Sequence, residues 1–308
     1  HMYHWFNRHM KWGLKEPIVE VDFKLLSNEE HAVWNEKHPE PPGGEAFEQK
    51  LTKWVAERDA KLVEKMTVAE LRKAWGALIG RTTPKYKEVA REKVTKVKRD
   101  GYLEFTDILR LKARGESLPV VSLYPAKDWN GKAVLILSDN GKAGLFAGDG
   151  KPTAAVRAHL AAGTSVVGVD LFQQGEFLKD GKPLAQSRVV RNPRQFAGYS
   201  FAYNHTLFAR RVHDVQTVLA WVRGFESEKP EHIRVEAAGN IAPVAVAALA
   251  VAGKGVNEAA VNAGTFSFAD LKSYRNPNFL PGAVKYGDLK SLRRLAAAQG
   301  IKFIKAAK

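Results

Sequence analysis

Residues 232–250 constrain the fold more than any other part of this 308-residue sequence. The segment begins with apolar residues at alternate positions, Ile233 and Val235, which is typical of a strand. Small residues lead into a turn at Gly239, and Pro243 then suits the first turn of a helix. Because the following residues are alanine, valine and leucine, we expect this helix to be buried against a sheet.

From about residue 95 onward, apolar strand patterns alternate with helical ones. The expected strands are 102–111, 118–124, 132–137, 165–171, 233–238, 259–262 and 301–304, and the clearest expected helices are 152–162 and 208–222. Such alternation predicts an α/β fold with a mostly parallel sheet flanked by helices. Glu236 lies unusually within an apolar strand, so we expect it to pair with an arginine or to border a polar cavity.

Residues 1–94 are interpreted as a helical N-terminal extension, and residues 95–308 as the α/β domain. A proline-rich hinge at 38–44 precedes two amphipathic helical patterns. The second pattern starts at Thr67, which forms a capping-box motif with the glutamate three residues later. We expect the tryptophans of these helices, Trp54 and Trp75, to pack in a core.

The formal net charge of +15 is spread along the chain, with one local concentration of arginines. This candidate anion-binding or ligand-binding patch consists of Arg188, Arg191, Arg194, Arg210 and Arg211. A solvated basic surface is the simpler interpretation. An acidic polysaccharide is a plausible partner, whereas nucleic acid is weaker because no aromatic-interleaved basic motif occurs.

Other functional signals are missing from the sequence. The chain has no cysteine, so disulfides, a thiol nucleophile and thiolate metal sites are excluded. It has no apolar run of the roughly 20 residues that a membrane span needs. No phosphate-binding or dinucleotide-binding glycine motif is present, and His1, His4 and His9 near the N-terminus make a poor metal motif. We therefore expect no membrane association, no cofactor and no metal.

Five segments together resemble the α/β-hydrolase superfamily, and within it the bacterial acetyl xylan esterase-like hydrolases. They are Val167–Glu176, Tyr203–Asn204, Arg211–Asp214, the 232–250 segment and Phe279–Asp288. The similarity covers about residues 95–308. Residues 1–14 resemble the closing helix of another such domain, which implies a tandem protein with a preceding hydrolase domain as partner. By resemblance alone, an exported protein is favoured.

The resemblance also implies where catalytic groups should lie. Gly239 matches the nucleophile position of a nucleophile elbow, and glycine cannot attack a carbonyl group. The backbone of Asn240 and that of Gly141 match the oxyanion-binding region. No histidine follows His232, and the 95–308 domain is interpreted as C-terminally incomplete. No catalytic residue is therefore assigned.

Three further polar residues are interpreted structurally. Asp288 is expected to hold a loop, while His205 and His213 are expected to be packing or surface histidines rather than catalytic bases.

Three functions remain open at this stage. In the first, the chain is a degenerate, non-catalytic domain that supports an associated esterase or binds carbohydrate, acidic or acetylated. In the second, it is an active carboxylic-ester hydrolase with an unrecognised nucleophile or with parts supplied by a longer chain. A nucleic-acid-binding module is a third possibility that rests on charge alone.

Overall fold

A computed structural model of the chain describes residues 1–190, 197–224, 229–252 and 255–305. The chain divides into two compact units, His1–Lys53 and Trp54–Lys308. The first unit contains α1 (Met2–Met10), α2 (Asn28–His31) and the beginning of α3 (Glu45–Lys65). Within it, the buried Asn7 accepts from the backbone N–H of Leu14 and donates to its carbonyl oxygen, so that the end of α1 is fixed locally.

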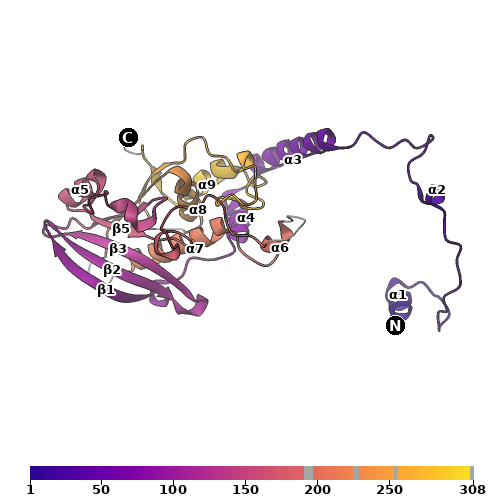
Figure 1. Cartoon of the computed structure of the whole chain (residues 1–308), viewed down its shortest axis with the longest axis horizontal. Coiled ribbons are helices and arrows are strands. Elements are labelled where there is room, and N and C mark those ends of the chain that lie inside the picture. The colour runs from indigo at the N-terminus through magenta and orange to yellow at the C-terminus, as the bar shows by residue number, and fades with distance from the viewer. Residues whose placement is uncertain (191–196, 225–228, 253–254, 306–308) are drawn as a thin grey trace. The chain divides into compact units, whose positions relative to one another are not determined.

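The second unit is built on one eight-stranded sheet (Figure 1). Its strands are β1 (Ala90–Arg99), β2 (Tyr102–Leu111), β3 (Glu116–Pro125), β4 (Lys132–Leu137), β5 (Ser165–Val169), β6 (His232–Ala238), β7 (Glu258–Asn262) and β8 (Lys302–Phe303). The spatial order is β1-β2-β3-β5-β4-β6-β7-β8. Strands β1, β2 and β3 form an antiparallel meander, β3 is antiparallel to β5, and the five remaining strands are parallel.

Both faces of the parallel part of the sheet are covered. The helices of the second unit are α4 (Val68–Ile79), α5 (Ala154–Ala161), α6 (Gly198–Phe201), α7 (Leu207–Arg223), α8 (Ala242–Ala252) and α9 (Asp288–Ala297). The larger apolar cluster joins one sheet face to α4, α7, α8 and α9, and the smaller one joins the other face to α5. Alternate residues of β4 separate in this way, since Leu135 belongs to the larger cluster and Val134 to the smaller. This arrangement confirms the predicted α/β fold.

Two expectations about the N-terminal region differ from the structure. The expected division between residues 94 and 95 lies inside β1, a strand that the sequence analysis did not predict. The helix α4 already supplies the core residues Leu71, Trp75 and Ile79, so it belongs to the second unit. Trp75 packs in the core as predicted, but the prediction for Trp54 was wrong, because 57% of its surface is exposed on α3.

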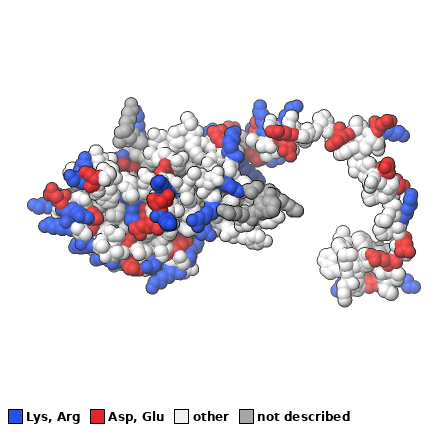
Figure 2. Space-filling view, viewed as in Figure 1, with Lys and Arg blue, Asp and Glu red and all other residues white. Residues whose placement is uncertain are grey.

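Within the described ranges, no helix has the length and apolar character that crossing a membrane requires. Figure 2 shows lysine and arginine side chains dispersed over the visible face of the second unit, with acidic side chains among them. Positive charge is therefore dispersed over this face, as it is along the sequence.

Candidate functional site

The strand β6 ends in a sharp turn at Gly239, whose φ is 76°. This backbone conformation is left-handed, and glycine adopts it without the steric cost that a β-carbon brings. The short 3-10 helix at Gly239–Ile241 follows, and α8 begins at Ala242. All but one of the residues of α8 are buried. The strand, turn and buried helix predicted for residues 232–250 are therefore confirmed.

The carboxylate of Asp139 occupies the space above this turn. Asp139 follows β4, which pairs with β6 up to Leu137 and Ala237, so the two strand ends lie side by side. The Oδ2 atom of Asp139 accepts a hydrogen bond of 3.1 Å from the backbone N–H of Asn240. A β-carbon added at Gly239 would lie only 2.9 Å from the same oxygen. A serine at this position would therefore require the Asp139 side chain to move.

The loop after β4 is held by Asp170, the residue that follows β5. Its buried carboxylate accepts from the backbone N–H of Lys142 at 2.9 Å, from Nζ of Lys142 at 2.6 Å and from the backbone N–H of Glu176 at 3.0 Å. A β-carbon at Gly141 would lie 2.1 Å from Oδ1 of Asp170. The N–H of Gly141 donates to the carbonyl of Ser138. Both candidate oxyanion donors, at Gly141 and Asn240, thus already bind oxygen atoms of the protein.

The acidic and basic residues near the end of the sheet have structural partners. Asp288 accepts from the hydroxyl of Ser267 at 2.6 Å, which confirms that it holds a loop. Glu236 pairs with Arg234 at 2.7 Å and His159 at 3.2 Å, which confirms the expected arginine partner. Burial alone would raise the pKa of Glu236, but the hydrogen bond from His159 and the two nearby cationic groups bring it below its ordinary value.

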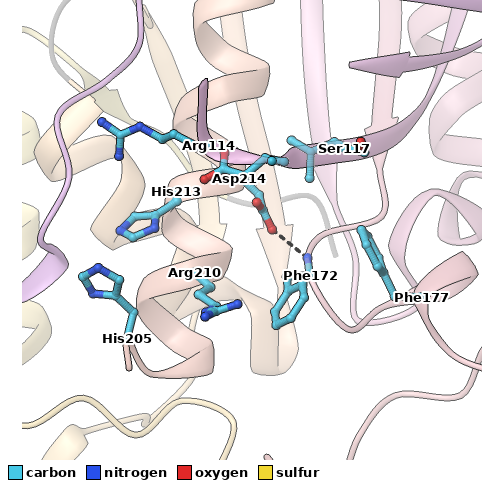
Figure 3. Close-up of a pocket in the computed structure, with 11 residues that line it drawn as sticks. Arg114, Ser117, Phe172, Phe177, His205, Arg210, His213 and Asp214 are labelled. Atoms are coloured by element: carbon cyan, nitrogen blue, oxygen red, sulfur yellow. Dashed lines mark hydrogen bonds between the residues drawn. The ribbon is translucent and has the colours of Figure 1, made fainter. Parts of the chain in front are cut away.

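A groove opens beside this region, between the β2–β3 connection, the loop after β5 and the start of α7 (Figure 3). It comprises two cavities of about 360 and 330 Å³ that share Phe172, His205 and Arg210 in their walls. We call it the α7 groove and define it by Arg114, Glu116, Phe172, Phe177, Arg188, His205, Arg210, His213 and Asp214. The guanidinium of Arg210 lies over the ring of Phe172, 5.0 Å from its centroid.

The predicted arginine patch is only partly assembled in this groove. Arg188 and Arg210 line it. Arg211 is buried instead and donates to the carbonyl oxygens of Phe172 and Gln173, each at 3.1 Å, so it holds the loop after β5. Arg191 and Arg194 lie outside the described residues. Sequence analysis missed Arg114, which comes from a turn far away in the chain and carries no motif of its own.

The inner wall of the groove contains two buried ionisable residues of α7. Asp214 accepts a 2.6 Å hydrogen bond from the backbone N–H of Phe172, and burial raises its pKa to about 7 (Figure 3). His213 donates from Nε2 to the carbonyl oxygen of Ile79 at 2.6 Å, and burial lowers its pKa to about 4. His213 is therefore a neutral packing histidine, as predicted, and its Nε2 proton is already engaged. His205 is exposed and contacts the His213 ring edge-to-face.

Comparison with known proteins gives structural relatives only. No protein-family model and no curated protein matches the sequence. The glucuronoyl esterase of Solibacter usitatus superimposes with a TM-score of 0.53 at 13% identity, over 79% of this chain and 74% of that chain. This chain has an α/β-hydrolase-like fold. Acetyl xylan esterase 1 of Thermoanaerobacterium sp. JW/SL YS485 matches with a TM-score of 0.48 at 15% identity, over 79% of this chain and 93% of that chain.

In this α/β-hydrolase-like fold, Gly239 lies at the edge of the sheet where such folds bind ligands. In open α/β sheets, ligands bind beyond the carboxyl ends of the strands, where neighbouring connections leave in opposite directions. The connection after β4 runs to β5 on one side, and that after β6 runs to β7 on the other. Asp139 and Gly239 lie at this point. No group of three histidine or acidic residues suited to holding a metal ion occurs among the residues that the structure describes.

Proposed function

We propose that this chain is a non-catalytic α/β-hydrolase-like domain that binds carbohydrate or supports an associated carbohydrate esterase. The observation that carries the proposal is the contact of Asp139 with Asn240 above Gly239. Acyl transfer needs a nucleophile and free N–H donors for the developing oxyanion. Here Gly239 has no side chain at the turn, and the N–H group of the next residue, Asn240, is hydrogen-bonded to the carboxylate of Asp139. A negative charge at this place would also repel an oxyanion.

Carbohydrate is the ligand class that the relatives support. The similar structure that superimposes with a TM-score of 0.53 is named as a glucuronoyl esterase. The formal net charge of +15 favours an acidic polysaccharide over a neutral one. An acetylated polysaccharide and a preceding hydrolase domain remain further proposed partners.

A second function is favoured by the same carboxylate. Asp139 carries its oxygen close to the place that a serine hydroxyl would take, so it could act as a general base toward water. Asp139 would accept a proton as water attacks an ester carbonyl carbon. The protonated carboxyl would then return this proton to the departing alkoxide when the C–O bond breaks. This activity needs no nucleophile at Gly239.

Hydrolysis of an aryl acetate tests these two functions. We expect the native chain and the Gly239→Ser variant both to react at the buffer rate. The native turn has no nucleophile, and among the described residues only Asp139 lies within 4 Å of the β-carbon that a serine would add, so that serine has no histidine base beside it. The measurement is release of the phenol over time by the full chain, with the Gly239→Ser/Asp139→Ala double variant included to free the N–H of Asn240.

Asp139→Asn separates the second function from the first. If the native chain turns over and Asp139→Asn lowers the rate about 100-fold, as loss of a general base would, Asp139 is catalytic and the non-catalytic proposal fails. Asp100→Asn is the matched control, since Asp100 is an exposed carboxylate in the β1–β2 turn. An acyl-enzyme burst from Gly239→Ser would contradict the expectation that this variant reacts at the buffer rate.

A further inference from the structure

We propose that the α7 groove binds a sugar that carries a carboxylate, namely a uronic acid within an oligosaccharide. This proposal rests on the proposed function in one respect, which is that the ligand is a carbohydrate. It concerns a site built from the β2–β3 connection, the loop after β5 and α7, and it uses neither Gly239 nor Asp139. Binding in the groove is therefore independent of whether the turn after β6 carries out hydrolysis.

The first argument is the state of the arginines that line the groove. Within the described part of the chain, Arg114, Arg188 and Arg210 form no ion pair with an aspartate or glutamate. Elsewhere in the second unit, Arg81, Arg91 and Arg110 each pair with a carboxylate. A guanidinium presents paired donors that match a carboxylate in two-point geometry. The groove thus offers guanidinium donors that the protein itself leaves to a ligand.

The position of Arg210 adds a second recognition element. Its guanidinium lies over the Phe172 ring, and the ring of Phe177 meets Phe172 edge-to-face at 5.8 Å between centroids. The aromatic rings form an apolar wall beside the charged group (Figure 3). A pyranose has an apolar C–H face that suits such a wall, and a carboxylate at its rim would reach Arg210. A bare inorganic anion has no apolar surface to place against this wall.

The acidic side chains of the groove distinguish a uronic acid from a phosphorylated ligand. Glu116 and Asp214 both line the larger cavity. Glu116 already accepts from Nη1 of Arg81, at 2.6 and 2.7 Å. Carboxyl groups in this position accept hydrogen bonds from hydroxyl groups but repel a dianionic phosphate. The lining therefore fits a ligand with several hydroxyl groups and a single negative charge.

The size of the groove fits more than one sugar unit. Its cavities of about 360 and 330 Å³ each reach the lower end of the 300–1,000 Å³ range that is usual for small-molecule sites. They share the Phe172, His205 and Arg210 side chains, with Arg114 in one cavity and Arg188 in the other. A short acidic oligosaccharide that extends through both cavities would contact Arg210 near its midpoint.

Calorimetric titration of the full chain tests this proposal. The probes are a trisaccharide that carries one uronic acid, its neutral counterpart, and inorganic phosphate. We expect the acidic trisaccharide to bind at least about 10-fold more tightly than the neutral one, since only its carboxylate can form charge-assisted hydrogen bonds with the guanidinium groups. Arg210→Gln should weaken binding of the acidic sugar by about 10-fold or more and change that of the neutral sugar little.

The matched control is Arg293→Gln. Arg293 lies over the ring of Phe303 at 5.3 Å, so this variant removes the same kind of arginine-aromatic contact at a site outside the groove. Equal affinity for the acidic and neutral sugars would overturn the proposal, as would equal losses in Arg210→Gln and Arg293→Gln. Phosphate binding as tight as that of the acidic sugar would overturn the assignment to a sugar acid.

These outcomes are distinguishable from failure of the proposed function. Aryl acetate turnover that depends on Asp139 would end the non-catalytic proposal and leave the groove untouched. Absence of acidic-sugar binding in a chain without turnover would end only the inference about the groove. A nucleic-acid oligomer that displaces the acidic sugar with a steep salt dependence would favour a phosphate-backbone ligand and overturn it too.

Discussion

Replacing Trp75 with alanine should lower the free energy of unfolding of the second unit by about 3–5 kcal/mol, the usual cost of truncating a buried aromatic residue. Trp75 has no exposed surface. Its indole Nε1–H donates to Oγ of Ser291 at 2.9 Å, and its ring lies 6.3 Å from that of Phe268. The substitution leaves a cavity between α4 and α9 and removes the donor for the buried hydroxyl of Ser291.

Urea denaturation followed by circular dichroism measures this loss, and Trp54→Ala is the matched control. Trp54 is largely exposed on α3, and its indole ring contacts the guanidinium of Arg58. Removing it should cost well under 1 kcal/mol, as surface substitutions usually do. A loss below 1 kcal/mol for Trp75→Ala, or a separate transition for the helical region, would show that α4 is not part of the same cooperative unit.

Several strands of the sheet were predictable because their apolar residues follow one another or alternate with polar ones. The predicted segments 102–111 and 132–137 coincide with β2 and β4. The strand β1 was not predictable in this way, because its sequence is rich in lysine and arginine and its side chains are mostly exposed. Edge strands carry such charges to prevent pairing with other chains, and the charges hide the strand pattern.

The sequence predicted the site only at Gly239, where the type of a single residue determines the local structure. Gly239 indicated a turn without a side chain, and the structure gives the left-handed φ of this turn. The carboxylate of Asp139 lies above this turn because β4 and β6 are adjacent, although Asp139 and its hydrogen-bond donor Asn240 are 101 positions apart in sequence. Arg114 reaches the α7 groove in the same non-local manner. Arg211 belonged to a cluster in sequence, but its place on α7 directs it into the protein.

Asp214→Asn should change the pH dependence of stability strongly. Burial raises the pKa of Asp214 from 3.8 to about 7, although the backbone N–H of Phe172 and the cationic groups of Arg81 and Arg211 lower it in part. Nearby Glu116 raises it further. The native protein therefore binds a proton at Asp214 between about pH 4 and pH 7 that the unfolded chain has released. Stability from this group is complete below pH 4 and is lost as the pH rises through 7.

An asparagine at this position can still accept from the N–H of Phe172 and cannot ionise. Relative to the native chain, Asp214→Asn should thus gain stability between pH 4 and pH 8, on the order of 4 kcal/mol at about 1.4 kcal/mol for each pKa unit. His213 acts in the opposite sense, because its pKa is lowered to about 4 and stability from it is lost as the pH falls from 6.5 through 4. Both chains contain His213, so its contribution largely cancels in their difference.

Urea denaturation of both chains at pH 4, 6 and 8 gives the required differences in free energy of unfolding. Asp100→Asn is again the control for the removal of one carboxylate, since Asp100 is exposed. A constant difference for Asp214→Asn across this range would mean that Asp214 ionises as readily in the native protein as in the unfolded chain. The inner wall of the α7 groove would then carry a permanent negative charge at neutral pH, and a uronic acid would bind there less tightly.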